Sequence, residues 1–357
     1  MSESIFSYLK NDNRGPIKNI DEVDSFVFTM LSYCKFEYYI RRHIDRVKIK
    51  DFAKDYREHI FNTLDTNKDR LVFLELLEED IRYQDLEIAY MEEYFDEKIE
   101  VQYASIGIMI NKSIFVSYRG TDTTLLGWKE DFNLSYLDEI PGQVMAKETL
   151  SYLMHEYKKY DFFVGGHSKG GLLAVSSVIN QPISNQERIK YVMDLDSPGL
   201  KDDVLNSDGY LRMIDKIHTF VPEHSVVGLI YRKKQQVTVV ETTNNGIMEH
   251  YGFAWMVEDN HFAVIKVLES GEELDDSVFN TVLKQMSKEE LEQFSMIVYS
   301  LLQDESGLLK INELMSPRKI KEILRVYKDL DDSQKEQLKK TGLSIAGMLL
   351  KEKIFKK

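Results

Sequence analysis

The run from Phe162 to Ala174 constrains the fold more than any other part of the sequence, because it places Ser168 between glycines. A β-prone apolar stretch leads into Gly166-His167-Ser168-Lys169-Gly170, and small apolar residues that suit a helix follow it. Gly-x-Ser-x-Gly in this context is typical of a strand, a strained turn and a helix that hold the serine hydroxyl clear of the sheet. The alternative is a loop in which the pattern occurs by chance, and the flanking strand and helix patterns argue against it. Ser168 is therefore a candidate nucleophile.

Composition limits the classes of partner and compartment. The chain has 357 residues, 43% of them hydrophobic, enough for one large α/β domain with additions or for two modest domains. A formal net charge of −14 argues against general affinity for nucleic acid or anionic membranes. The single Cys34 excludes an intrachain disulfide and fits a reducing compartment. With neither a signal-peptide pattern nor a long apolar run, we expect a cytoplasmic protein without a transmembrane segment.

The pattern changes twice along the chain. Residues 1–100 read mostly as helices, with apolar residues at helical spacing between Asp21 and Tyr39, whereas the acidic segment Asp85–Ile99 shows no clear pattern. From residue 101 to about residue 270, strand and helix patterns alternate, which predicts a mainly parallel sheet covered on both faces. Residues 271–357 read as charged helices. We therefore predict an N-terminal helical region at 1–100 packed on a core at 101–270, followed by a C-terminal helical extension at 271–357.

Particular elements follow from the same patterns. Two β-prone runs, Ser105–Ile110 and Ser113–Tyr118, flank Asn111-Lys112 and predict a hairpin. After the hairpin we expect strands at 161–164, 189–196, 216–221 and 235–242, with helices at 142–159 and 170–180. The C-terminal extension predicts helices at 287–302, 317–330 and 332–351.

A serine nucleophile needs a base, and histidine is the usual one. In the chain order typical of this arrangement, the acid and then the histidine follow the serine. Four histidines follow Ser168, namely His218, His224, His250 and His261. His250 follows the last predicted strand and a polar loop, which favours it as the base. His218 lies in a predicted strand, His224 lies in a loop at a strand end, and His261 is the reserve candidate.

The acid that orients the base has more than one candidate. The turn around Ser168 is called the elbow below, and the helix that follows it the elbow helix. Asp196 ends the strand after that helix, and strand carboxyl ends in open α/β sheets face the ligand crevice. Asp194 lies two residues earlier and deeper in the strand. Glu223 ends the next strand, which is the more usual place for the acid. Either end residue can also serve as an ordinary loop residue or cap, so sequence physics does not choose between Asp196 and Glu223.

Donors for the developing oxyanion are expected from two places. The backbone amide after the nucleophile belongs to Lys169. A loop after an early strand, Arg119 to Asp122, offers Gly120 for an unusual turn and Thr121 as the second donor. The alternative is a simple strand-to-loop turn stabilised by Asp122.

These residues resemble class 3 lipases. The segment Tyr118 to Asp122, with Trp128 and Asp131, is similar to the strand-end motif of those lipases, and Gly166 to Gly171 is similar to their elbow. More closely, the chain resembles a bacterial branch of lipase-like α/β-hydrolases, the Mbeg-like proteins. That likeness covers roughly residues 1–265 and includes the segments Asn19–Tyr33, Asp196–Gly199, Val221–Gly228 and His250–Trp255.

The resemblance implies an α/β-hydrolase fold and hydrolysis of a carboxylic ester through an acyl-enzyme. It implies Ser168 as nucleophile, His250 as base, Asp196 as acid, and the amides of Lys169 and Thr121 as oxyanion donors. Glu223 is the second choice of acid, since Ser225 stands where class 3 lipases carry theirs. The implied substrate is a small-molecule ester or a lipid-like compound, with no cofactor and no metal. The competing function is a non-catalytic hydrolase-like protein that binds a ligand or another protein.

Overall fold

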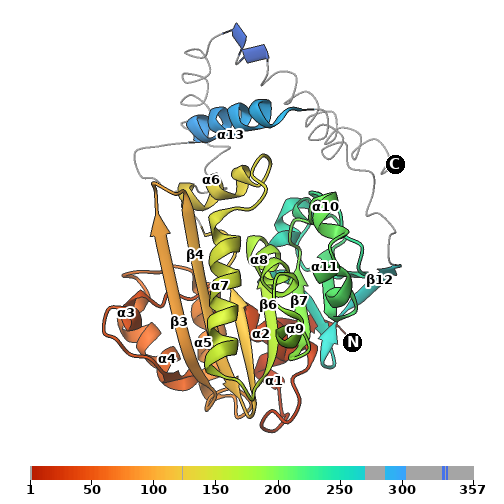
Figure 1. Cartoon of the computed structure of the whole chain (residues 1–357). Helices are drawn as coiled ribbons and strands as arrows, with labels where there is room; N and C mark the ends of the chain where they lie inside the picture. Colours follow the sequence, from red (N-terminus) through yellow and green to blue (C-terminus); the bar gives the residue numbers. More distant parts are fainter. Residues whose placement is uncertain (1, 123, 270–285, 303–331, 334, 337–357) are drawn as a thin grey trace. The chain divides into compact units, whose positions relative to one another are not determined.

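The computed structural model describes residues 2–122, 124–269, 286–302, 332–333 and 335–336 (Figure 1). Contacts divide the chain into two compact units. The first comprises Met1–Tyr94, Tyr103–Gly120 and Gly142–Glu273, and the second comprises Phe95–Gln102, Thr121–Pro141 and Leu274–Lys357. Among the described residues, we find no helix with the length and hydropathy needed to span a bilayer.

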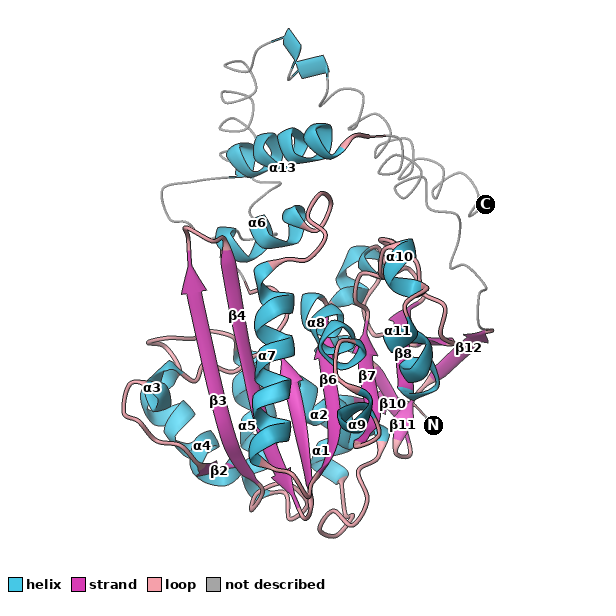
Figure 2. Ribbon diagram, in the orientation of Figure 1, coloured by secondary structure: helices cyan, strands magenta, loops and turns pink. Residues whose placement is uncertain are grey.

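A nine-stranded sheet forms the centre of the described structure, in the order β12-β9-β8-β7-β6-β5-β4-β3-β2 (Figure 2). Strands β5 to β9 run parallel to one another, whereas β4 pairs antiparallel with β5, β12 with β9, and β2 with β3. The strands are β2 Val47–Lys48, β3 Glu87–Asp96, β4 Val101–Ile110, β5 Ser113–Tyr118, β6 Asp161–His167, β7 Ile189–Leu195, β8 Ile217–Pro222, β9 Val237–Val240 and β12 Val264–Leu268. A small antiparallel sheet joins β1 (Glu3–Ser4), β10 (Met256–Glu258) and β11 (His261–Phe262).

Helices cover both faces of the sheet in the first unit (Figure 2). One face carries α1 (Ile5–Asn11), α2 (Glu22–Leu31) and α5 (Lys68–Glu79), and the other carries α7 (Pro141–Glu156), α8 (Lys169–Ile179) and α9 (Ile183–Gln186). Successive residues of β6 point to opposite faces of the sheet: Gly165 faces Thr29 of α2, whereas Gly166 faces the start of α8. The remaining helices of this unit include α3 (Glu37–Ile40), α4 (Ile49–Asp55), α10 (Asp202–Leu205) and α11 (Asp208–Met213). This is an α/β-hydrolase fold, as the sequence predicts.

Helix α2 packs directly behind the strands that lead to Ser168. Asp21 caps its first turn in a reciprocal capping box with Asp24, which satisfies backbone N–H groups at that end. Phe28 of α2 packs against Phe115 of β5 with ring centroids 5.3 Å apart, and both are fully buried. Burying an aromatic side chain of this size stabilises the fold by about 1.5–3 kcal/mol, so α2 is part of the core rather than a separate covering layer.

Most predicted elements are confirmed. The hairpin forms as β4 and β5, with Asn111 at a φ of 55° in the turn, and the strands and helices around Ser168 lie within a few residues of their expected bounds. Helix α13 (Lys288–Leu302) confirms the helix predicted at 287–302. The helix predicted at 317–330 lies outside the described residues, as does most of the one at 332–351.

The acidic segment 85–99, which has no clear pattern in the sequence, contains β3, so the N-terminal region at 1–100 is not helical throughout. The acidic residues of this segment obscure the apolar pattern that would predict a strand. Glu92 in its middle faces partly buried polar groups, where its Oε2 accepts hydrogen bonds from Thr149 Oγ1 at 2.8 Å and from the Tyr90 hydroxyl at 2.8 Å. Strands β10 to β12 are not expected from the sequence either, because each is short and β12 is largely exposed.

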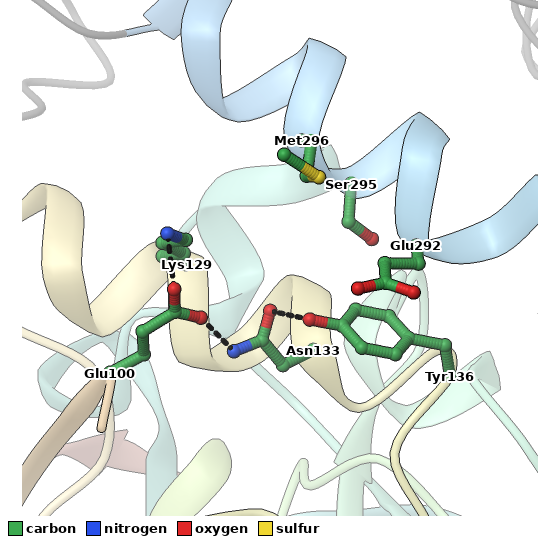
Figure 3. A pocket seen from close by; sticks show the side chains of 7 residues that line it. All are labelled: Glu100, Lys129, Asn133, Tyr136, Glu292, Ser295 and Met296. Atoms are coloured by element: carbon green, nitrogen blue, oxygen red, sulfur yellow. Dashed lines mark hydrogen bonds and ion pairs between the residues drawn. The ribbon is translucent and has the colours of Figure 1, made fainter. Parts of the chain in front are cut away.

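The second unit contains α6 (Leu125–Asn133) and α13. Ser295 of α13 donates to the carbonyl of Phe132 at 3.1 Å, which joins the two helices. A cavity of 170 Å³ lies between them (Figure 3). On its α6 side Asn133 links Glu100 and Tyr136 through hydrogen bonds of 2.8 Å each. The cavity is lined by Glu100, Lys129, Asn133, Tyr136, Glu292, Ser295 and Met296.

Candidate active site

Ser168 lies on a sharp turn between β6 and α8. Its φ of 59° and ψ of −131° are unusual for a residue with a side chain and cost on the order of 1–3 kcal/mol. The flanking glycines are required by close approach: a Cβ on Gly166 would lie 2.0 Å from the carbonyl oxygen of Gly170, and one on Gly170 would lie 2.2 Å from that of Tyr118. The amide of Ser168 donates to Leu195 O at 2.8 Å, which ties the turn to the end of β7.

The structure brings His250 and Asp196 together. His250 ends a short 3-10 helix (η4, Gly246–His250), and its Nδ1 lies 2.6 Å from Asp196 Oδ2. Asp196 follows β7, is fully buried, and has a φ of 45° that turns its carboxylate toward the histidine. The side chain of His250 is 26% exposed. Glu223, the second choice of acid, is exposed, and within the described residues it makes no hydrogen bond or ion pair with His250.

The carboxylate of Asp196 is held in its charged form. Burial alone raises the pKa of this carboxyl, but the charge of His250 and hydrogen bonds from His250 and Ser225 outweigh burial and hold the pKa below its ordinary value. Ser225 donates to Asp196 Oδ1, and its own hydroxyl oxygen accepts from the amide of Gly228 at 2.8 Å. Ser225 therefore holds the carboxylate that follows the preceding strand, β7.

His167 connects the elbow to the loop that carries His250. The Tyr33 hydroxyl lies 2.7 Å from His167 Nδ1, and His167 Nε2 lies 2.8 Å from the carbonyl oxygen of His250. Because a carbonyl only accepts, Nε2 carries the proton and Nδ1 accepts from the tyrosine. The His167 and His250 rings have centroids 4.6 Å apart, so the imidazole of His250 lies beside the residue that precedes Ser168. Among the described residues, no hydrogen bond joins Ser168 Oγ to His250.

Burial and the neighbouring charge of His250 lower the pKa of His167 to about 3, from an ordinary 6.5. Between these two pH values the unfolded chain binds a proton that the folded chain does not. The contribution of His167 to stability is therefore complete above pH 6.5 and is lost as the pH falls toward 3.

We expect His167→Gln to reduce the pH dependence of the unfolding free energy. As the pH falls from roughly 6 to 4, the unfolding free energy of wild type should decrease relative to that of the variant by about 1.4 kcal/mol per pH unit, because glutamine does not titrate. Urea unfolding of both proteins at several pH values measures it. Parallel curves would show that His167 takes up a proton equally in both states.

The expected oxyanion donors lie in different units. Lys169 is the first residue of α8, where backbone N–H groups point out of the helix end. The backbone of Gly120 lies against the elbow, since a Cβ placed on it would be 3.2 Å from Ser168 Cβ. Thr121 belongs to the second unit, where its hydroxyl donates to Asp131 Oδ2 at 2.6 Å. The roles of the Lys169 and Thr121 amides stay predictions.

The other candidates from the sequence have different partners. His218 stacks on Tyr191 with ring centroids 4.3 Å apart, and His261 contacts the carbonyl of Phe262 at 3.2 Å. Asp194 is buried and accepts from Thr219 Oγ1 at 2.8 Å, deep in the sheet. His224 Nδ1 lies 2.7 Å from Glu249 Oε1.

Sequence reasoning missed the residues that support the pair. Tyr33 ends the segment Asn19–Tyr33, part of the resemblance, but it lies far from the elbow in sequence and nothing indicated its contact with His167. Ser225 and His224 lie in the quoted segment Val221–Gly228, but nothing in the sequence indicated their partners. Within the described part of the chain, no group of three or more His, Cys, Asp or Glu side chains is arranged to hold a metal ion.

Comparison with known proteins gives a family and several structural similarities. A search of curated proteins found no match. Among solved structures, the chain is similar to Lip2 lipase from Yarrowia lipolytica (14% identity, 50% of this chain and 82% of that one, TM-score 0.33). It is also similar to a mutant of MDLA from Penicillium cyclopium (12%, 71% and 88%, TM-score 0.39) and to a Rhizomucor miehei lipase propeptide complex (14%, 71% and 97%, TM-score 0.36).

With TM-scores this low, the fold assignment depends on the sheet order and the elbow instead. The family assignment has a different basis, since the Mbeg1-like family model matches residues 77–300, well over half of the sequence. The resemblance drawn from the sequence is thereby confirmed: the chain belongs to the Mbeg1-like family.

Proposed function

We propose that this protein is a serine hydrolase that cleaves carboxylic esters. The observation that carries the proposal is the His250–Asp196 pair, 2.6 Å apart, beside an elbow that presents Ser168 at a positive φ. An imidazole held by a buried carboxylate next to a strained serine is the arrangement that acyl transfer needs.

In the proposed reaction Ser168 Oγ attacks the ester carbonyl carbon while His250 Nε2 takes the hydroxyl proton. The carbonyl oxygen becomes an oxyanion that amide donors stabilise, and each such donor lowers the barrier by about 3 kcal/mol. His250 then returns the proton to the leaving alcohol, which leaves an acyl group on Ser168. Water attacks this acyl-enzyme with His250 again as base, and the acid product and free serine result.

The electrostatics of Asp196 support its part in this cycle. Its lowered pKa favours the carboxylate, so it accepts a hydrogen bond from His250 Nδ1–H and leaves Nε2 free to take the proton of Ser168. It also stabilises the imidazolium that forms during the attack. The proposed substrate is a small-molecule ester or a lipid-like compound.

A fluorophosphonate probe tests the proposal, because Ser168 Oγ would displace fluoride from phosphorus and keep the probe. We expect the label on the peptide that contains Ser168, with turnover of p-nitrophenyl esters in a panel from acetate to palmitate. Ser184→Ala, at an exposed serine of α9, is the matched control and should label like wild type. A folded protein that neither labels nor turns over any ester of the panel would instead support a ligand-binding protein with a hydrolase fold.

A further inference from the structure

A second imidazole–carboxylate pair lies next to the first. His224 Nδ1 lies 2.7 Å from Glu249 Oε1, compared with 2.6 Å between His250 Nδ1 and Asp196 Oδ2. His224 directly precedes Ser225, which donates to Asp196, and Glu249 directly precedes His250. Each member of the second pair is therefore one residue away from a group that makes or supports the first.

The carboxylate of Glu249 is buried and well supplied with donors. Its side chain is 4% exposed, and it accepts from the amide of His224 at 2.9 Å and from the amide of Gly246 at 3.0 Å in addition to His224 Nδ1. The backbone carbonyl of Glu249 accepts from Trp255 Nε1 at 3.0 Å, and the side chain of Trp255 is fully buried. These contacts fix both ends of the 3-10 helix that presents His250.

The His224 ring is suited to this supporting role and not to the role of base. Its Nδ1 pairs with Glu249 just as His250 Nδ1 pairs with Asp196, but this contact leads to η4 and not to the elbow. His250, by contrast, lies against the ring of His167, the residue next to the nucleophile. The loop after β8 therefore supports both partners of the His250–Asp196 pair. Its Ser225 contacts Asp196, and its His224 contacts η4, which carries His250.

We propose that His224 and Glu249 are positioning residues that hold the imidazole of His250 within hydrogen-bonding distance of Asp196. The inference rests on the proposed function, since it concerns the base of that reaction. A buried carboxylate that loses one charge-assisted hydrogen bond is left partly unsatisfied. We expect the segment that carries it, here η4, to move until water or another donor replaces the lost bond. A shift of η4 moves the imidazole of His250 relative to Ser168 without altering the nucleophile itself.

Three variants test the pair. His224→Phe keeps a ring but removes the donor, Glu249→Gln keeps the shape but removes the charge that faces His224 Nδ1, and His224→Asn keeps a donor near the position of Nδ1. We expect the first two to lower kcat about 10- to 100-fold with little change in KM, as supporting residues of catalytic groups do. His224→Asn should restore most of the activity. Combining His224→Phe with Glu249→Gln should cost no more than the worse single change, because both changes weaken the same imidazole–carboxylate pair.

His155→Phe, at an exposed histidine of α7, is the matched control and should retain wild-type kcat. A second readout does not need turnover: the proton between His250 Nδ1 and Asp196 should give a strongly downfield NMR signal that Asp196→Asn abolishes. We expect this signal to shift or broaden in His224→Phe and Glu249→Gln, and to remain in His155→Phe.

The two hypotheses fail differently. If wild type does not label with the fluorophosphonate, the proposed function is wrong, and the NMR signal still decides whether the second pair positions His250. If wild type labels but His224→Phe and Glu249→Gln fold and keep both kcat and an unchanged downfield signal, the positioning role is wrong. Fully additive losses in the double variant would also contradict it.

Discussion

Replacing Ser168 with alanine is expected to lower kcat for ester hydrolysis by about 10⁵- to 10⁶-fold, to the level that binding and oxyanion stabilisation alone provide. The change removes the attacking oxygen, so no acyl-enzyme forms and the remaining rate reflects water attack on the bound ester. The strained backbone at Ser168 should survive, because alanine adds no new contact and the flanking glycines keep the turn.

The measurement is steady-state turnover of the best ester of the p-nitrophenyl panel, with circular dichroism to confirm folding. Ser184→Ala serves as the matched control at an exposed serine. Turnover within tenfold of wild type in folded Ser168→Ala would show that hydrolysis proceeds without this hydroxyl, and the proposed mechanism would have to be abandoned.

Asp196→Asn is expected to lower kcat by about 10⁴-fold with the fold intact, because an amide facing His250 Nδ1 favours the wrong imidazole tautomer. In that tautomer Nε2 carries the proton and does not accept one from Ser168. Glu223→Gln is the matched control at the competing acid candidate, and since Glu223 is exposed we expect kcat within a few-fold of wild type.

Kinetics of both variants on the same ester decide between the two acids. A large loss in Glu223→Gln together with a small loss in Asp196→Asn would reverse the assignment. Equal small losses would mean that the carboxylate 2.6 Å from His250 does not orient the base at all.

The sequence predicted the elbow and the sheet around it because their signals are local. The glycines around Ser168 and the apolar runs of β5 to β8 each determine a short piece of backbone by steric and packing rules. Asp196 and His250 were reachable as candidates for a related reason. Residues at the carboxyl ends of parallel strands converge on one edge of the sheet, so position in the chain order narrows the choice.

Other features depend on tertiary contacts that have no local signal. β3 was missed because an acidic residue such as Glu92 reads as solvated, whereas its partner Thr149 comes from a helix distant in sequence. Ser225 and Glu249 look like ordinary loop residues until the fold places Asp196 and His224 beside them. Choosing between Asp196 and Glu223 from the chain alone fails for the same reason, since the choice depends on where η4 lies.

The hydrogen bond from Tyr33 to His167 has a consequence for how much of the chain any functional fragment must retain. The family model begins at residue 77, yet the phenol that fixes the neighbour of the nucleophile belongs to residue 33, and Phe28 fills the back of the sheet. A shortened protein that starts at the family boundary would lose the partner of an imidazole nitrogen and uncover apolar side chains of β5. Residues of the first forty are thus part of the same folded core as the Ser168 elbow, and comparisons that omit them leave out contacts which hold that turn.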